Sequence, residues 1–230
     1  MTETMLKNNI AKLRLRLRQN VEKYDRQESE ILLLAVSKTR SAAEIRHAYA
    51  CGLDQFGESY LQEAGEKISA LTDLPITWHF IGPVQSNKTR PIAEQFHWVH
   101  SVARQKVARR LSEQRPPGKP PLQVCLQVNI SGESSKSGVT LEDLPALAEF
   151  VDKLPRLALR GLMAIPAATD CAAEQRAQFA RLREALGALQ LQYPQMDTLS
   201  MGMSGDMEAA IAEGSTLLRI GTAIFGPRQG

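Results

Sequence analysis

The residue with the clearest chemical potential is Lys38, which ends an unbroken apolar run, ILLLAVSK, at Ile31 to Lys38. A run of this length without polar alternation is typical of a strand buried on both faces, as in parallel sheets covered by helices. The lysine then lies at the carboxyl end of a central strand, the rim where such folds bind ligands. Desolvation there favours the neutral amine, which can attack a carbonyl to form a Schiff base. The alternative is a strand-end lysine that extends its charge into solvent.

A second candidate is Arg219, in the last apolar run, LLRIGTAIFG. Side chains alternate along a strand, so Leu217, Arg219 and Gly221 share one face. If that face points inward, a guanidinium that cannot discharge itself enters the interior and requires an acceptor. That acceptor is either a ligand or a carboxylate on a neighbouring strand.

Small hydrogen-bonding residues follow the last two apolar runs. GMSGD, at Gly202 to Asp206, opens a short helix whose backbone N–H groups and Ser204 hydroxyl can hold an anion. Gly221 and Thr222 add close backbone approach and a second hydroxyl. Each loop alone is weak evidence, because serine and aspartate also cap helices. Together with an amine nucleophile and an inward arginine on one rim, they predict a site for pyridoxal 5'-phosphate.

The elements that position these residues alternate along the chain. Apolar runs separated by helical stretches predict strands at Ile31–Lys38, Gln55–Glu58, Thr77–Gly82, His97–Val102, Leu122–Ile130, Leu157–Ile165, Thr198–Met203 and Leu217–Gly226. Eight such units in 230 residues favour an α/β fold, a (β/α)8 TIM barrel forming one domain over residues 1–230, with an open doubly wound sheet as the alternative. In a closed barrel the first and eighth strands are neighbours, which brings Lys38 and Arg219 to one mouth.

Two segments need separate interpretation. PPGKPP, at Pro116–Pro121, is interpreted as a long connection between a helix and a strand, not as an interdomain linker. In the basic N-terminal segment, Ile10, Leu13, Leu17 and Val21 fall at helical spacing. This pattern predicts an extra amphipathic helix, in preference to a targeting peptide.

Composition excludes several classes of protein. The chain is 43% hydrophobic and 23% charged, which is ordinary for a globular protein, and its net charge of +3 is too small to indicate nucleic-acid binding. No apolar stretch reaches the roughly 18 residues of a membrane span. Three cysteines without a CxxC motif favour a reducing compartment, hence the cytoplasm. His79, His97 and His100 lack a convincing third metal ligand, so packing or hydrogen bonding is favoured over metal binding.

Several blocks occur in order: AVSK, FGESYLQE, WHFIGPVQSNK, SKSG, GLMAI, LSMGMSGDMEAAI and RIGTAIFG. They resemble, nearly motif for motif, the pyridoxal phosphate homeostasis protein family, also called the proline synthetase co-transcribed homologue. The match covers about Ile31 to Gly226. The resemblance implies the barrel of the alanine racemase N-terminal domain and a role in intracellular vitamin B6 homeostasis. The family is thought to buffer or carry pyridoxal phosphate, with no established enzymatic reaction.

The resemblance also implies roles for individual residues. Lys38 becomes the Schiff-base lysine and Arg219 the partner of the pyridine nitrogen. The implied phosphate ligands are one backbone group and three small residues: Met203, Ser204, Gly221 and Thr222. One position departs from the family, which usually has asparagine where this chain has Ser59. Asn87 and Lys136 lie in matching motifs, and their roles stay open.

Three functions follow as alternatives: a monomeric carrier of pyridoxal phosphate with apo-enzymes as candidate partners, an amino-acid racemase that uses the same cofactor, and a barrel lyase whose lysine reacts directly with a sugar phosphate. Two-base racemisation needs a second base opposite Lys38. In the resembling racemases that base is a tyrosine from a carboxyl-terminal β domain, whereas this chain ends at Gly230, just after the eighth strand. Among its tyrosines only Tyr60 is expected near the rim, so the carrier is favoured.

Overall fold

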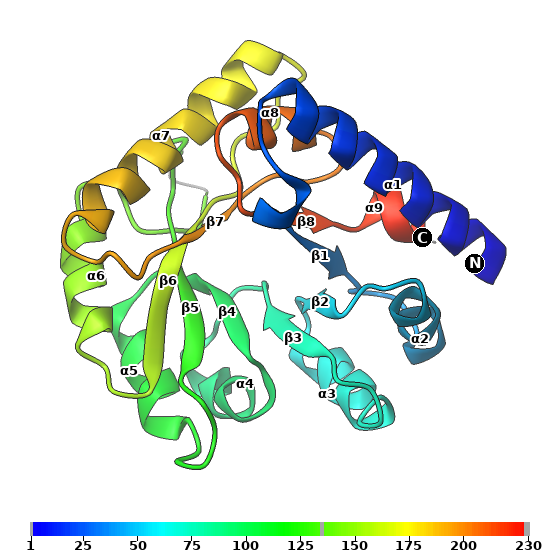
Figure 1. Ribbon diagram of the computed structural model, residues 1–230. Coiled ribbons are helices and arrows are strands. Elements are labelled where there is room, and N and C mark those ends of the chain that lie inside the picture. The colour runs from blue at the N-terminus through cyan, green and yellow to red at the C-terminus, as the bar shows by residue number, and fades with distance from the viewer. Residues whose placement is uncertain (1, 134–135, 228–230) are drawn as a thin grey trace.

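The computed structural model describes residues 2–133 and 136–227, and its strands close into a barrel (Figure 1). Eight parallel strands follow one another in chain order, and the first pairs with the last. They are β1 (Leu32–Val36), β2 (Gln55–Glu58), β3 (Thr77–Phe80), β4 (Trp98–Val102), β5 (Leu122–Gln127), β6 (Leu157–Met163), β7 (Thr198–Ser200) and β8 (Leu217–Ile220). The barrel expected from the apolar runs is confirmed, and the open sheet is wrong.

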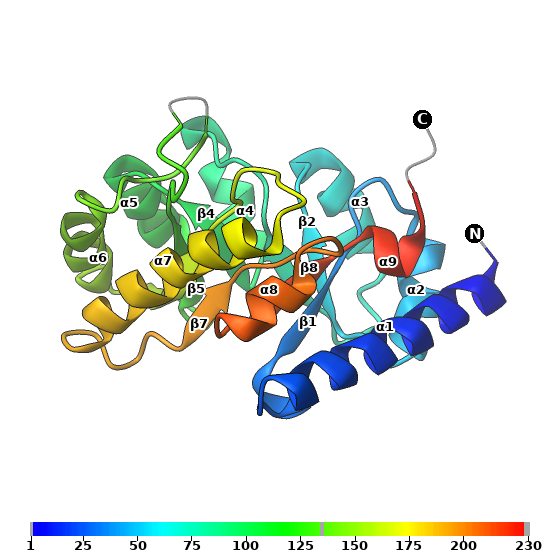
Figure 2. The same ribbon diagram turned by 90° about the horizontal axis from the view of Figure 1, so that it is seen from above.

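Helices form the outer layer of the barrel, as Figures 1 and 2 show. They are α1 (Glu3–Lys23), α2 (Ala42–Ala50), α3 (Leu61–Ala70), α4 (Thr89–Gln95), α5 (Gln105–Gln114), α6 (Leu144–Asp152), α7 (Ala172–Gln190), α8 (Met207–Ala212) and α9 (Thr222–Phe225), with short 3-10 turns η1 (Glu28–Glu30) and η2 (Ser86–Lys88). The proline-rich segment joins α5 to β5, as predicted. No helix in the described part of the chain is both long and apolar enough to cross a membrane.

Most strands end earlier than their apolar runs. Lys38 lies two residues beyond the end of β1, in a turn, and β8 stops at Ile220 where the prediction extended it to Gly226. The remaining apolar residues form α9, which the periodicity did not separate from the strand. An apolar run marks burial, but a strand ends where neighbouring backbones stop pairing at the barrel mouth.

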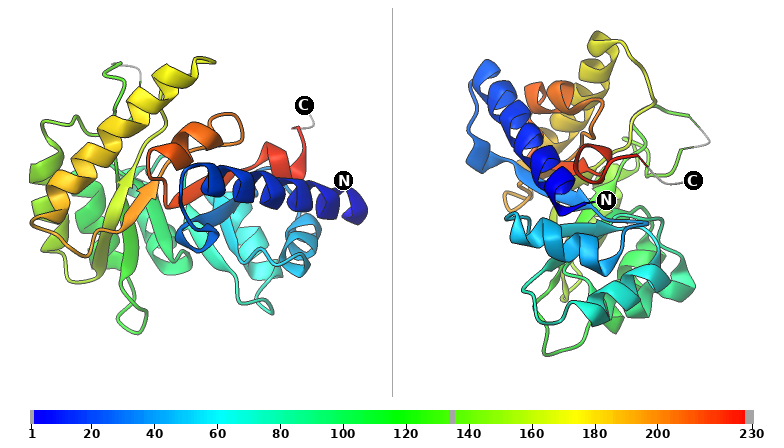
Figure 3. Two further views of the ribbon diagram at one scale, coloured as in Figure 1. Left: turned by 45° about the horizontal axis from the view of Figure 1, so that its top comes forward. Right: turned by 90° about the vertical axis from the view of Figure 1, so that its right-hand side faces the viewer.

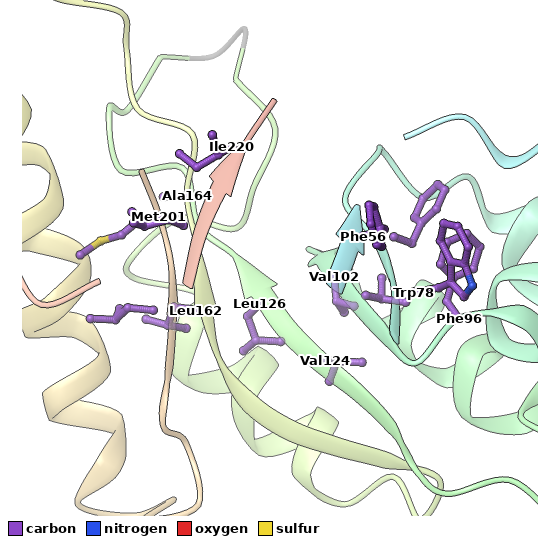
Figure 4. Close-up of a cluster of buried hydrophobic side chains, with 14 of the residues drawn as sticks. Phe56, Trp78, Phe96, Val102, Val124, Leu126, Leu162, Ala164, Met201 and Ile220 are labelled. Atoms are coloured by element: carbon purple, nitrogen blue, oxygen red, sulfur yellow. The ribbon is translucent and has the colours of Figure 1, made fainter. Parts of the chain in front are cut away.

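The main hydrophobic core lies between the strands and the helices (Figure 4). Phe56, Trp78 and Phe96 form an aromatic group beside β2 and β3, whereas Leu126 and Leu162 belong to an aliphatic group beside β5 and β6. The rings of Phe56 and Trp78 lie 6.0 Å apart in a tilted arrangement, which suits the aromatic quadrupoles. Both groups hold the strands in the register that places their carboxyl ends at one mouth.

The additional helix α1 packs along α8 and α9, as Figure 3 shows from two sides. Its buried apolar side chains are those predicted from helical spacing, with Leu6 added: Leu6, Ile10, Leu13, Leu17 and Val21. Asn9 Nδ2 donates to the Ile224 carbonyl at 3.0 Å, and Arg16 donates to the Ser204 carbonyl at 3.0 Å. The helix therefore supports the loops that follow β7 and β8.

Candidate functional site

A pocket of about 290 Å³ lies at the carboxyl-terminal mouth of the barrel. Six of its lining residues are the predicted site residues: Lys38, Met203, Ser204, Arg219, Gly221 and Thr222. Residues separated by more than 180 positions therefore meet because β1 pairs with β8, with Leu34 opposite Arg219. The closed sheet thus brings the amine, the guanidinium and the two hydroxyl-bearing loops to one cavity.

The backbone on both sides of Lys38 is held by two polar side chains of α3. Thr39 adopts a left-handed conformation with φ of 64°, which non-glycine residues rarely adopt. Its N–H donates to Glu63 Oε1 at 2.5 Å, and the Ser37 carbonyl accepts from Lys67 Nζ at 2.7 Å. These contacts hold the turn in which Lys38 reaches the pocket.

Lys67 belongs to an ionic cluster with two carboxylates. Its Nζ lies 2.8 Å from Glu58 Oε1 and 2.5 Å from Glu63 Oε1, and the Ser37 hydroxyl donates to the same Glu58 oxygen at 2.5 Å. Glu58 is fully buried, and desolvation raises its pKa despite the attraction of Lys67. Glu58 Oε2 has no hydrogen-bond partner among the described residues. The charge of Lys67 is thus compensated within the protein.

Arg219 is held by neutral acceptors. It is only 4% exposed, and it donates to the carbonyl and hydroxyl of Ser200, the latter at 2.9 Å, and to the Ala164 carbonyl at 2.8 Å. No carboxylate in the described ranges forms a salt bridge with it, so the alternative of a neighbouring-strand ion pair is not realised there. Burial lowers the pKa of Arg219 to about 10, which leaves it cationic at neutral pH. A buried positive charge without a paired carboxylate therefore borders the pocket.

The loop after β7 depends on a glycine. Gly202 has a φ of 96°, and a Cβ added there would lie 2.5 Å from the Ala210 Cβ. Both the conformation and the close approach of α8 exclude a side chain. The Gly202 carbonyl accepts from the Arg219 N–H at 2.9 Å, so this turn and β8 are linked directly.

The two loops expected to bind an anion also contact each other. The Ser204 hydroxyl accepts from the Ala223 N–H at 3.3 Å, across the start of α9. The Met203 N–H donates to Asp206 Oδ1 at 2.6 Å. Asp206 therefore already uses the Met203 backbone donor that the family resemblance implied for phosphate. Ser204, Gly221 and Thr222 line this end of the pocket and remain the candidate anion-binding groups there.

Sequence reasoning missed part of the lining: Val36, Arg40, Ile81, Ile165 and Gly226, whereas Gly205 lies in the predicted GMSGD loop. A signal was present for some of these residues. Val36 and Arg40 stand two positions on either side of Lys38, and Ile81 and Ile165 follow β3 and β6 directly or nearly so. Gly226 lies in the pocket only because α9 turns the chain back toward the mouth.

Four further residues singled out from the sequence differ in whether they line the pocket. Ser59, where the family usually has asparagine, lines the cavity, whereas Tyr60 next to it is exposed and does not. Asn87 belongs to η2, and neither it nor Lys136 lines the pocket. The Lys136 carbonyl accepts from Asn129 Nδ2 at 3.3 Å. Ser59 is therefore the only one of these four in contact with the cavity.

The three histidines form hydrogen bonds, as predicted. His97 Nδ1 accepts from the Trp78 N–H at 2.9 Å, and His79 Nδ1 lies 2.9 Å from His100 Nε2. Burial lowers the pKa of all three, so they are neutral at neutral pH. Within the described residues, no cluster of three or more histidine, cysteine or acidic side chains is arranged to hold a metal ion.

Comparison with known proteins places these residues in a family. The family model described as "Alanine racemase, N-terminal domain" matches residues 14–229. The chain is 63% identical over 221 residues to the pyridoxal phosphate homeostasis protein of Pseudomonas aeruginosa, covering 96% of this chain and 95% of that protein.

Solved structures agree with that assignment. PipY of Synechococcus elongatus PCC7942, solved with PLP bound, has a TM-score of 0.82 and 39% identity, over 96% of this chain and all (100%) of that chain. Alanine racemase from Corynebacterium glutamicum shares the fold, with a TM-score of 0.73 and 17% identity, over 98% of this chain and 62% of that chain. The chain therefore belongs to the pyridoxal phosphate homeostasis protein family, built on the barrel of the alanine racemase N-terminal domain.

Proposed function

We propose that this protein binds pyridoxal 5'-phosphate in the pocket at the barrel mouth and holds it as a Schiff base with Lys38, in order to store and deliver it inside the cell. The observation that carries the proposal is the meeting of an amine, a buried arginine and two hydroxyl-bearing loops in one small cavity. The name of the Pseudomonas aeruginosa relative and the PLP-bound structure of PipY support it.

The lining groups fit the two ends of this cofactor. The amine of Lys38 suits its aldehyde, and the hydroxyls of Ser204 and Thr222 suit a phosphate, beside Gly221 where no side chain blocks the backbone. The cavity volume of about 290 Å³ is near the lower end for ligand pockets, roughly 300 Å³, as expected for one small cofactor.

The middle of the pocket fits an aromatic ring. Val36, Ile81 and Ile165 supply apolar surface for its faces, and Arg219 supplies a cation for the pyridine nitrogen. Bound pyridoxal phosphate supplies an electron sink to catalysis. A permanent guanidinium at the ring nitrogen disfavours protonation there, because two like charges would meet, and this weakens the sink.

The same lining favours a carrier over a racemase. Racemisation by two bases requires a second proton-transfer group within hydrogen-bond reach on the face opposite Lys38. No histidine, carboxylate or tyrosine among the described residues lines the pocket. Lys38 is thus the one ordinary base that these residues offer, which supports holding the cofactor without turnover.

Delivery requires contact with an apo-enzyme, and the rim offers a surface for it. Tyr60, Ile165 and Met203 are large apolar residues that stay 54%, 44% and 40% exposed at or beside the mouth. Apolar groups gathered around a mouth are typical of interaction sites. A cytoplasmic, monomeric carrier completes the proposal, and the free thiols of Cys51, Cys125 and Cys171 suit that reducing compartment.

The proposal is tested by transfer in the presence of a scavenger. Protein loaded with pyridoxal phosphate is mixed with an apo-aminotransferase and a phosphatase that destroys the free cofactor, and regained aminotransferase activity is measured. We expect the loaded protein to restore activity when an equal amount of free cofactor does not. Lys38→Ala should lose this effect, and Lys136→Ala, which changes a lysine that does not line the pocket, should keep it. Restoration no better than that by free cofactor would contradict delivery.

A further inference from the structure

A line of polar side chains crosses the barrel interior from Arg219 to β2. Arg219 donates to Ser200 Oγ at 2.9 Å, and Ser200 Oγ lies 2.8 Å from His100 Nδ1. His100 Nε2 lies 2.9 Å from His79 Nδ1, and His79 Nε2 lies 2.9 Å from Gln55 Oε1. Barrel interiors are usually filled by branched aliphatic side chains, so a continuous polar line there requires an explanation.

Arg219 sets the direction of every hydrogen bond in this line. A guanidinium only donates, so Ser200 Oγ accepts from it and has its own proton left to donate to His100 Nδ1. Neutral His100 then donates from Nε2 to His79 Nδ1, and neutral His79 donates from Nε2 to Gln55 Oε1. Both histidines are fixed as the Nε2–H tautomer.

The reverse direction leaves a buried proton without a partner in this line. If His100 Nδ1 carried the proton, Ser200 Oγ would accept from both His100 and Arg219, and the serine proton would lose its acceptor in the line. Burial and the nearby Arg219 charge lower the pKa of His100 to about 3, which also excludes the imidazolium form near neutral pH. One arrangement therefore satisfies every group.

We propose that Ser200, His100 and His79 are positioning residues for Arg219. The two histidines orient the Ser200 hydroxyl so that its oxygen accepts from the Arg219 guanidinium. This hydrogen bond holds the cation at the edge of the pocket. The orientation of Arg219 toward the cofactor ring rests on the proposed function. The direction of the hydrogen bonds does not, because it follows from the protein alone.

Nitrogen-15 NMR of histidine-labelled, cofactor-free protein tests this directly at neutral pH. We expect His79 and His100 both to be protonated at Nε2 and unprotonated at Nδ1. Ser200→Ala removes the donor to His100 Nδ1, so the signal of that nitrogen should move to the position of an imidazole nitrogen without a hydrogen bond. Both rings should stay protonated at Nε2, because His79 and the Gln55 Oε1 acceptor remain. Ser215→Ala is the matched control, because Ser215 is equally buried and its hydroxyl donates to the Met201 carbonyl at 2.7 Å, outside the line. That variant should leave the His100 Nδ1 signal and both tautomers unchanged.

Cofactor binding provides the second measurement. Ser200→Ala should raise the dissociation constant for pyridoxal phosphate by about fivefold, the effect of losing one of several hydrogen bonds to Arg219, and Ser215→Ala should leave it unchanged. An Nδ1–H or doubly protonated ring in the natural protein, or a His100 Nδ1 signal that does not change in Ser200→Ala, would overturn the positioning role. Expected tautomers in a protein that fails to bind the cofactor would overturn the proposed function and leave the hydrogen-bond line intact.

Discussion

Two buried cations at the barrel mouth have opposite surroundings. Lys67 is 5% exposed and contacts two carboxylates, Glu58 and Glu63, whereas Arg219 is 4% exposed and contacts only carbonyl and hydroxyl oxygens. The charge of Lys67 is compensated by the protein and serves to fix the turn that carries Lys38. The charge of Arg219 is left available to a ligand, and neutral groups keep it in place.

The largest change in the free energy of unfolding is expected when the positive charge of Lys67 is removed. Lys67→Met leaves Glu58 fully buried without its cationic partner, so the free energy of unfolding should fall by about 3–5 kcal/mol. Urea unfolding at neutral pH measures this. The double variant Lys67→Met/Glu58→Gln should recover part of the loss, because the uncompensated buried carboxylate is gone. A loss below about 1 kcal/mol in the single variant would contradict a structural role for the cluster.

Acidification should change the stability contributed by the histidines near Arg219 and by Glu58 near Lys67 in opposite directions. His79 and His100, in the line that ends on Arg219, have pKa values lowered by burial, so the folded state binds fewer protons than the unfolded state. Stability is therefore lost as pH falls below the ordinary histidine pKa of about 6.5, by up to about 1.4 kcal/mol per pH unit for each ring. Glu58 has a raised pKa, so the folded state takes up a proton first and gains stability as pH falls toward the unfolded value.

Urea unfolding at pH values between about 7 and about 5 checks these signs. The natural protein should lose stability on acidification, and Glu58→Gln should lose more over the same interval because the opposing contribution of Glu58 is absent. A stability of the Glu58→Gln variant that stays level from neutral to mildly acidic pH would show that the histidines are not held neutral in the folded state.

Replacing Arg219 should lower the free energy of unfolding least among these changes, while it weakens the binding of pyridoxal phosphate strongly. Arg219→Met leaves the carbonyls of Ser200 and Ala164 without their donor, a loss of about 1–3 kcal/mol in the free energy of unfolding. Removal of a charged hydrogen bond to the ring nitrogen should raise the dissociation constant for pyridoxal phosphate by roughly tenfold or more. Isothermal titration and urea unfolding measure the two quantities. A variant that loses stability but binds the cofactor normally would remove Arg219 from the site.

The sequence was sufficient to place the strands and to bring the chemical groups together. Apolar runs located the eight strands, and side-chain alternation with barrel closure predicted that Lys38 and Arg219 share a mouth. Glycine and hydroxyl residues after the last two strands located the loops around Ser204 and Thr222. These features are local or depend on one topological rule, so a single sequence carries them.

The groups that support the site were not predictable in the same way. Lys67 lies on α3, where a lysine is ordinarily expected to face solvent, and its contact with the Ser37 carbonyl depends on how that helix packs against the barrel. The line through His79, His100 and Ser200 joins three strands whose relative rotation appears only in the folded barrel. Pairing of buried polar groups is a property of the whole structure, and no local pattern encodes it.

Lys38, which lines the pocket together with Arg219, is the amine that we propose holds pyridoxal phosphate. The direct measurement is to reduce the loaded protein with borohydride, digest it, and locate the fixed cofactor by mass spectrometry. We expect a single modified peptide, labelled at Lys38, and a colourless Lys38→Ala variant. A label at another lysine such as Lys136, or a yellow reducible adduct that persists in Lys38→Ala, would contradict it.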